Sequence, residues 1–169
     1  MTNAQGTFIQ LWALSSFTSS LQDRFAPNSV CFGCGPKNAQ GLRIKSNPEE
    51  SHVVSSWVPG PQHVAFSGFL SGGIISTLLD CHCNWTAAYA LMEKSVARSP
   101  PATVTSELRV KFLEPTPLKP LLLRASPTEV AEHRVTVAGT LEVDGRATAS
   151  ATGVFVAVRE GHPAFHRWE

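Results

Sequence analysis

The longest run of apolar positions lies between Ser71 and about Met92. Ser71 is a residue type that caps helix N-termini, and Gly72 and Gly73 follow it in the first turn. The apolar side chains occupy most sides of the expected helix: Ile74, Ile75, Leu78, Leu79, Trp85, Ala88, Tyr89 and Leu91. Such a helix is buried nearly all round and spans about 30 Å. The pattern therefore predicts one long central helix.

Stretches rich in β-branched and aliphatic residues surround this helix. One strand is predicted before it, over 52–58, and Pro59-Gly60-Pro61 ends that strand. Four strands are predicted after it, with a tight turn at Asp144-Gly145 between the last two: 104–113, 121–130, 133–143 and 147–158. This order favours an α+β fold in which a curved antiparallel sheet of five or six strands wraps one helix. An open sheet also leaves an edge, which a second copy of the chain would cover.

With 169 residues the chain is the size of one domain. We expect that domain to span residues 31–158. Residues 1–30 would form an N-terminal extension packed on it, with a short helix whose one face carries Phe8, Leu11, Trp12 and Leu14. Residues 159–169 show no periodicity and are expected to form a C-terminal tail.

Charged residues make up only 16% of the chain, below the usual quarter, which indicates that another copy covers part of the surface. The net charge of +1 and the lack of a basic stripe predict no nucleic-acid partner. No stretch approaches the roughly 20 apolar residues of a membrane span. A secretory signal carries Lys or Arg ahead of its apolar part, and residues 1–17 have neither there. We therefore expect a cytoplasmic homodimer, or a homotetramer built as a dimer of dimers, without a membrane partner.

The four cysteines raise the question of a metal site. Cys31 and Cys34 have the spacing of zinc ligands. Cys81 and Cys83 are two residues apart on the expected helix and diverge by about 200°, so both cannot easily join the first pair. We favour reduced structural thiols in a reducing compartment, and predict no metal and no cofactor.

Asp80 is the one charged side chain between Glu50 and Glu93 if histidines are counted neutral. Its helix carries a single polar line, formed by Gly73, Thr77, Asp80 and Asn84. A buried carboxylate without a partner costs several kcal/mol. Asp80 is therefore either a structural residue held by donors or a catalytic residue in a cleft.

The start of the same helix offers the second half of a hydrolytic site. Free backbone N–H groups at a helix N-terminus attract developing negative charge. The amides near Gly72 and Gly73 would hold a carbonyl oxygen, while Asp80 would activate a water molecule or attack directly. The combination suits hydrolysis of an acyl compound.

The segment Ser71-Gly72-Gly73-Ile74-Ile75-Ser76-Thr77-Leu78-Leu79-Asp80 resembles the helix motif of hotdog-fold thioesterases of the phenylacetate-pathway (PaaI-type) group. In that group His-Gly-Gly is followed by an acidic residue nine positions after the His. Residues 31–38, Cys-Phe-Gly-Cys-Gly-Pro-Lys-Asn, with Gly41-Leu42 are similar to the segment before the first strand of these proteins. Residues 105–115 resemble their strand after the helix, so that the resemblance covers roughly 31–158.

This resemblance implies a hotdog fold and hydrolysis of acyl-CoA at a dimer interface. It implies that Gly72 supplies the oxyanion N–H and that Asp80 acts as nucleophile or base. It also implies that Thr105 of the partner subunit positions water. Ser71 stands where the family has its His, and a serine cannot carry charge. His63, in the preceding loop, aligns with another recurrent His of the family and would compensate.

The acyl group would be bound by aromatic and polar side chains near the helix, suited to medium-chain or aryl acyl groups: Trp57, Phe66, Phe69, Trp85, Thr77 and Asn84. Basic residues would meet the phosphates of CoA: Arg98, Arg109, Lys111 and Arg124.

Two other functions remain open. Ser71 also fits a non-catalytic acyl-CoA-binding protein that has lost the motif His. A hydratase of the same fold would pair Asp80 with His82, but residues two apart on a helix point to different faces.

Strict strand alternation places the side chain of Thr105 on the face of Glu107 and away from the helix, unless a bulge re-aims it.

Overall fold

The computed structural model describes residues 19–169. The helix expected around Phe8 to Leu14 lies outside the described residues. Within them, a short helix α1 (Leu21–Phe25) precedes the sheet, and its Leu21 is buried in the main core. The boundaries expected for the extension, the domain and the tail stay predictions.

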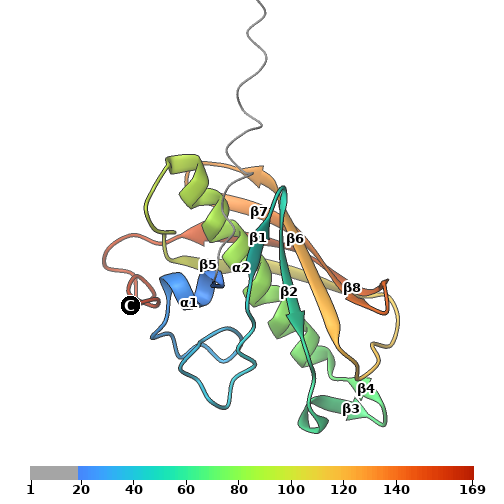
Figure 1. Cartoon of the computed structure of the whole chain (residues 1–169). Helices are drawn as coiled ribbons and strands as arrows, with labels where there is room; N and C mark the ends of the chain where they lie inside the picture. The colour runs from blue at the N-terminus through green and yellow to red at the C-terminus, as the bar shows by residue number, and fades with distance from the viewer. Residues whose placement is uncertain (1–18) are drawn as a thin grey trace, which may run out of the picture.

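One antiparallel sheet of six strands forms the body of the molecule, in the order β1-β2-β6-β7-β8-β5 (Figure 1). Its strands are β1 (Asn47–Glu49), β2 (His52–Trp57), β5 (Thr103–Phe112), β6 (Leu121–Val130), β7 (Arg134–Val143) and β8 (Arg146–Ala157). The five strands predicted from the sequence begin and end within one residue of those observed. Positive φ angles of 51° at Asp144 and 77° at Gly145 form the predicted tight turn between β7 and β8.

The sequence did not predict the shortest elements. These are β1, the 3₁₀ turn η2 (Pro61–His63), and the small hairpin of β3 (Val64–Phe66) and β4 (Phe69–Leu70). Each is two or three residues long, which is too short for an alternating pattern to be visible.

The central helix α2 (Gly72–Ser95) lies across the concave face of the sheet (Figure 1). Leu78, Leu79 and Trp85 are at most 1% exposed, and burying each such side chain stabilises the fold by about 1.5–3 kcal/mol. The helix approaches β7 closely at Gly139, where an added Cβ would lie 2.7 Å from the sulfur of Cys83. This arrangement is the predicted hotdog fold.

A loop and the C-terminal tail cover the side of α2 that faces away from the sheet. The loop over residues 26–46 contains no helix or strand, and its Leu42 accepts a 2.8 Å hydrogen bond from the indole of Trp57. From the tail, Trp168 stacks on Trp85 with ring centroids 4.4 Å apart. Among residues 19–169, no helix is both long enough and apolar enough to span a membrane.

Candidate functional site

Asp80 lies half-buried on α2, close to the edge strand β5. The hydroxyl of Thr105 donates a 2.7 Å hydrogen bond to Asp80 Oδ1. Burial raises the pKa of Asp80 above its usual value, and the Thr105 hydrogen bond and the charge of Arg167 offset only part of that rise. A half-buried carboxylate with a raised pKa is a better proton acceptor than an exposed one.

A β-bulge brings Thr105 to the helix side of β5. Thr105 pairs with Phe155 of β8, whereas Glu107 pairs with Val154, so Ser106 is an extra residue in the strand. The extra residue shifts the alternation, and Thr105 therefore shares a face with the buried Phe155. The hydroxyl that contacts Asp80 in this structure thus comes from the same chain.

Asp80 opens into a small hollow of about 70 Å³. Its lining comes from the loop, α2, β5 and the tail: Cys31, Cys34, Asp80, Cys81, Asn84, Trp85, Thr105 and Arg167. Asn84 Oδ1 accepts a 2.7 Å hydrogen bond from Thr103, and Arg167 donates one of 2.7 Å to the Thr103 carbonyl. Sequence reasoning missed Arg167, because nothing in the aperiodic tail indicates which residue folds back.

The first turn of α2 lies at the other end of the predicted polar line. Ser71 occupies the N-cap position, but its side chain makes no capping hydrogen bond, and its N–H donates to the His63 carbonyl at 2.9 Å. A Cβ added at Gly72 would lie 3.4 Å from the ring of Phe112. Thr77 donates its hydroxyl back to the Gly73 carbonyl at 2.9 Å.

Asp80 and the helix N-terminus do not meet within one chain. Asp80 comes eight positions after Gly72, and a rise of about 1.5 Å per residue puts them about 12 Å apart. Reacting atoms must approach within about 3–3.5 Å. One thioester carbon therefore cannot contact both groups of the same protomer.

A larger hollow of about 550 Å³ lies near the helix N-terminus, and Trp57, His63 and Ile74 line part of it. His63 Nδ1 accepts a 2.8 Å hydrogen bond from the Gly60 amide, and burial lowers the pKa of His63. The structure therefore separates the predicted residues into two groups, with Asp80, Asn84 and Thr105 in the small hollow and His63 and Trp57 in the large one.

The remaining aromatic pair lies on the hairpin of β3 and β4. The rings of Phe66 and Phe69 are 5.0 Å apart, and Phe66 is 61% exposed. Neither residue lines the hollow around Asp80.

His82 lies on a different side of α2 from Asp80. It is fully buried, with Nε2 3.0 Å from the Val53 carbonyl and Nδ1 2.9 Å from the Ser46 hydroxyl. Because a carbonyl only accepts, Nε2 carries the proton and Nδ1 accepts from Ser46. This role leaves no nitrogen for catalysis beside Asp80, which disfavours the hydratase.

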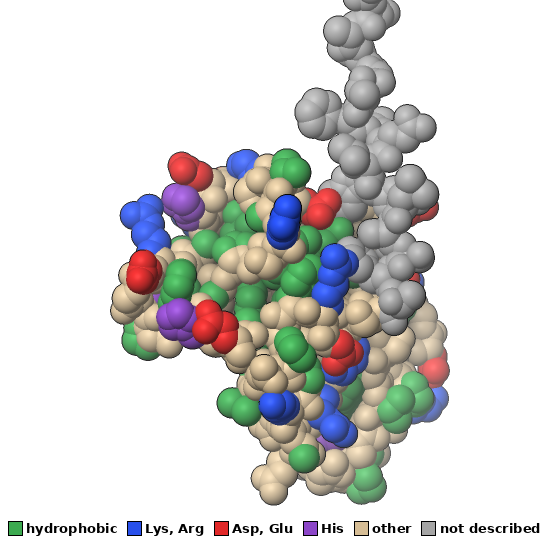
Figure 2. Space-filling view, turned by 60° about the vertical axis from the view of Figure 1, so that its left-hand side comes forward, with side chains coloured by type: hydrophobic (Ala, Val, Ile, Leu, Met, Phe, Trp, Pro, Cys, Tyr) green, Lys and Arg blue, Asp and Glu red, His purple; other side chains and the backbone are tan. Residues whose placement is uncertain are grey.

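Charged side chains are sparse and interspersed on the face shown in Figure 2. Three of the four basic residues suggested for CoA phosphates gather at a hollow of about 470 Å³ over the sheet: Arg109, Lys111 and Arg124. Arg98 does not line this hollow.

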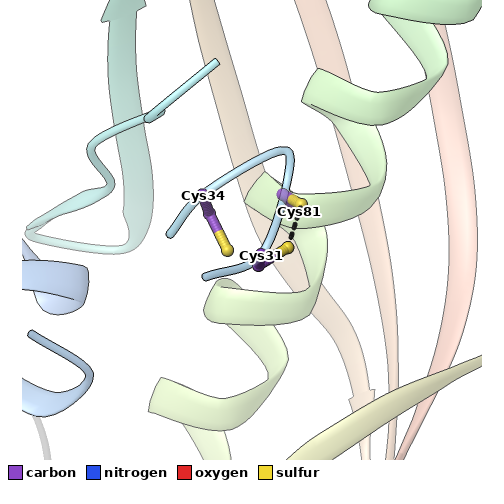
Figure 3. A group of neighbouring side chains, drawn as sticks. All are labelled: Cys31, Cys34 and Cys81. Atoms are coloured by element: carbon purple, nitrogen blue, oxygen red, sulfur yellow. Dashed lines mark hydrogen bonds between the residues drawn. The ribbon is translucent and has the colours of Figure 1, made fainter. Parts of the chain in front are cut away.

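Three sulfurs also converge beside Asp80. The side chains of Cys31 and Cys34 point from the loop toward Cys81 on α2 (Figure 3). Cys83 points elsewhere, toward Gly139 of β7. As the helical spacing indicated, only one cysteine of the second pair joins the first.

A family model of the thioesterase superfamily matches residues 67–150. A thioesterase superfamily protein from Shewanella loihica is 30% identical with a TM-score of 0.59, and the match covers 69% of this chain and 91% of that one. A protein from Bacillus halodurans solved with CoA is 26% identical with a TM-score of 0.57, covering 70% and 76%. A phenylacetic acid degradation-related protein from Ralstonia eutropha, 20% identical with a TM-score of 0.58 and covering 69% and 86%, shares the fold. No curated protein matches the chain.

Proposed function

The chain belongs to the thioesterase superfamily, and on that premise we propose that it hydrolyses acyl-CoA thioesters with Asp80 as the catalytic carboxylate. Membership supports thioester hydrolysis in general. The observation that carries the finer proposal is the half-buried Asp80, whose carboxylate lies in a hollow and accepts a hydrogen bond from Thr105.

In the proposed reaction Thr105 holds Oδ1 of Asp80 and orients the carboxylate. In one route the other oxygen, Oδ2, takes a proton from the water molecule that attacks the thioester carbon; the C–S bond then breaks, and the CoA thiolate leaves with that proton. In the other route Oδ2 attacks the carbon itself and displaces the CoA thiolate, and water then hydrolyses the acyl-enzyme anhydride. The raised pKa of Asp80 favours proton uptake in the general-base route, because desolvation disfavours the charged carboxylate.

The amides that stabilise the oxyanion come from a second copy of the chain. One protomer cannot supply both groups, since about 12 Å of helix separates Gly72 from Asp80. Within residues 19–169, strand β5 lies at the edge of the sheet, and edge backbone groups without a partner strand can pair with another strand. At its end Phe112 and Leu113 are 56% and 52% exposed, which suits burial against a partner. We therefore propose a homodimer whose Asp80 works with Gly72 and Gly73 of the partner.

The acyl group binds in the hollow of about 550 Å³ near the helix N-terminus. Trp57 and Ile74 offer apolar surface there, which suits medium-chain or aryl acyl groups. The relative solved with CoA and the gathered Arg109, Lys111 and Arg124 support CoA as the thiol part.

The experiment compares turnover of a panel of acyl-CoA thioesters by the wild-type protein and by Asp80→Asn. Loss of a general base lowers kcat by about 10²–10⁴-fold. Asp144→Asn is the matched control, because that carboxylate is exposed in the β7–β8 turn. Hydrolysis that persists in Asp80→Asn, or no turnover of any thioester by the wild type, would contradict the proposal.

The second candidate is a non-catalytic acyl-CoA-binding protein, and Ser71 favours it. Its side chain makes no capping bond and supplies no charge at the helix N-terminus. Saturable binding of unhydrolysed acyl-CoA to the wild type, with hydrolysis appearing in Ser71→His, would support this candidate over the enzyme.

A further inference from the structure

We propose that the thiols of Cys31, Cys34 and Cys81 bind a zinc ion, or another thiophilic divalent cation, where the loop before β1 crosses α2. The three sulfurs lie within 4.8 Å of one another, and those of Cys31 and Cys81 are 3.8 Å apart (Figure 3). With Zn–S bonds of about 2.3 Å, tetrahedral geometry puts ligand sulfurs about 3.8 Å apart. The sulfurs of Cys31 and Cys81 already have that spacing, and the other two sulfur–sulfur distances need to shorten by at most about 1 Å.

Two glycines make this convergence sterically feasible. The Gly35 amide donates a 2.8 Å hydrogen bond to the Cys31 carbonyl, closing a tight turn. A Cβ on Gly35 would lie 2.4 Å from the Cys31 amide nitrogen, and one on Gly33 would lie 2.3 Å from Cys81 Sγ. Both positions therefore require glycine if the loop is to present two thiols to the helix at this distance.

The surroundings favour the thiolate, which is the form that binds metal, at Cys31, whereas hydrogen bonding to Cys31 and burial raise the pKa values of Cys34 and Cys81. The pKa of Cys31 is lowered mainly by hydrogen bonds from the thiols of Cys34 and Cys81. The backbone amides of Cys34 and Gly33 lower it further. The indole N–H of Trp85 donates to Cys34 Sγ at 3.3 Å. A cation would displace the protons that the other two thiols retain.

The ligand set indicates the class of ion. Thiolates select zinc and other soft cations, whereas an iron–sulfur cluster is usually held by four cysteines. Within residues 19–169 no fourth cysteine reaches the group, since Cys83 faces β7. Three thiolates with a dication leave one negative charge, and the guanidinium of Arg167 lines the same hollow to offset it. The fourth tetrahedral position is left for water.

The bound ion acts as a clamp between the loop and the helix. Residues 26–46 contain no helix or strand, so side chains must hold this loop in place. The clamp fixes the loop to α2 at the residue next to Asp80. This inference does not rest on thioesterase activity, because it concerns only metal binding and its effect on stability.

The test measures metal content and metal binding directly. Untagged protein, purified under reducing conditions without chelator, is analysed for zinc per chain and, after stripping, titrated with Co²⁺. Co²⁺ bound to thiolates in a tetrahedral site gives charge-transfer absorption in the near ultraviolet and d–d bands in the visible range. Variants Cys31→Ser, Cys34→Ser and Cys81→Ser are compared with Cys83→Ser, which removes a buried thiol of the same helix outside the group.

We expect about one zinc per chain and saturable Co²⁺ bands in wild type and in Cys83→Ser. Each of the other three variants should bind at least about tenfold more weakly. Zinc should also raise the Tm of the stripped wild type but not of Cys81→Ser. The absence of both zinc and Co²⁺ bands in fully reduced wild type would overturn the proposal whether or not the variants fold. An equal loss of binding in Cys83→Ser would overturn it too. So would an intact mass lower by two hydrogen atoms, which indicates a disulfide between two of the three thiols.

Discussion

Replacing His82 by Gln should remove most of the sensitivity of the fold to mild acid. The imidazole is fully buried and hydrogen-bonded between Ser46 and the Val53 carbonyl, and burial lowers the pKa of His82 from 6.5 to about 4. The unfolded chain therefore binds a proton on His82 more readily than the folded chain does. Stability from this residue is fully present above about pH 6.5 and is lost as the pH falls toward about 4.

The magnitude follows from the two pKa values. One pKa unit corresponds to about 1.36 kcal/mol, so the full difference is worth about 3 kcal/mol, and about 2–3 kcal/mol of it is lost between about pH 7.5 and pH 4.5. Such a loss is a large part of the stability of a typical domain.

Guanidinium unfolding followed by tryptophan fluorescence at both pH values measures this loss at one fixed protein concentration. The loss on acidification should be smaller in His82→Gln by about 2–3 kcal/mol, although that variant is less stable at neutral pH. His133→Gln, at an exposed position, should behave like wild type. All three proteins are stripped of metal beforehand, so that release of a bound ion does not contribute to the difference and the comparison isolates His82. Equal acid sensitivity in His82→Gln and wild type would refute the reasoning.

Three further changes test other parts of the structure. Thr105→Val removes the hydrogen bond to the Asp80 carboxylate and should lower kcat about 10–100-fold. It should also shift the acidic limb of the pH–rate profile to higher pH, whereas Thr105→Ser should keep both kcat and the profile near wild type. Gly139→Ala should lower the free energy of unfolding, measured in denaturant melts, by about 1–3 kcal/mol, because its Cβ would lie 2.7 Å from Cys83 Sγ. Adding Cys83→Ala should restore part of that loss. Arg109→Gln should raise KM for an acyl-CoA several-fold but leave KM for the matching acyl-pantetheine unchanged in steady-state assays, because only the former carries the nucleotide phosphates.

The elements that hydrophobic periodicity determines could be predicted from the sequence. The run from Ser71 to Met92 and the four later strands are long enough for their spacing to report which face is buried, and the hotdog fold follows from their order. The polar position of Asp80 within an apolar helix was visible for the same reason.

Side-chain placement that depends on packing between distant segments could not be predicted in this way. The bulge at Ser106 reverses the face of Thr105, and no residue type nearby requires a bulge. Arg167 reaches the hollow because the tail folds back onto α2, which an aperiodic segment does not indicate. The sequence limited the thiol group to one cysteine of the second pair, but only the close approach at Gly33 shows that it is Cys81.

One turn of α2 connects the helix to four different parts of the fold. Successive residues point about 100° apart, so four consecutive side chains face all round. Asp80 bonds to β5, Cys81 meets the loop before β1, His82 bonds to β2, and Cys83 packs against β7. Three of these contacts remain when the carboxylate is replaced, and Asn occupies nearly the same volume as Asp. The helix should therefore keep its place in Asp80→Asn, and a loss of turnover with an unchanged Tm would report on the chemistry of the carboxylate rather than on the fold.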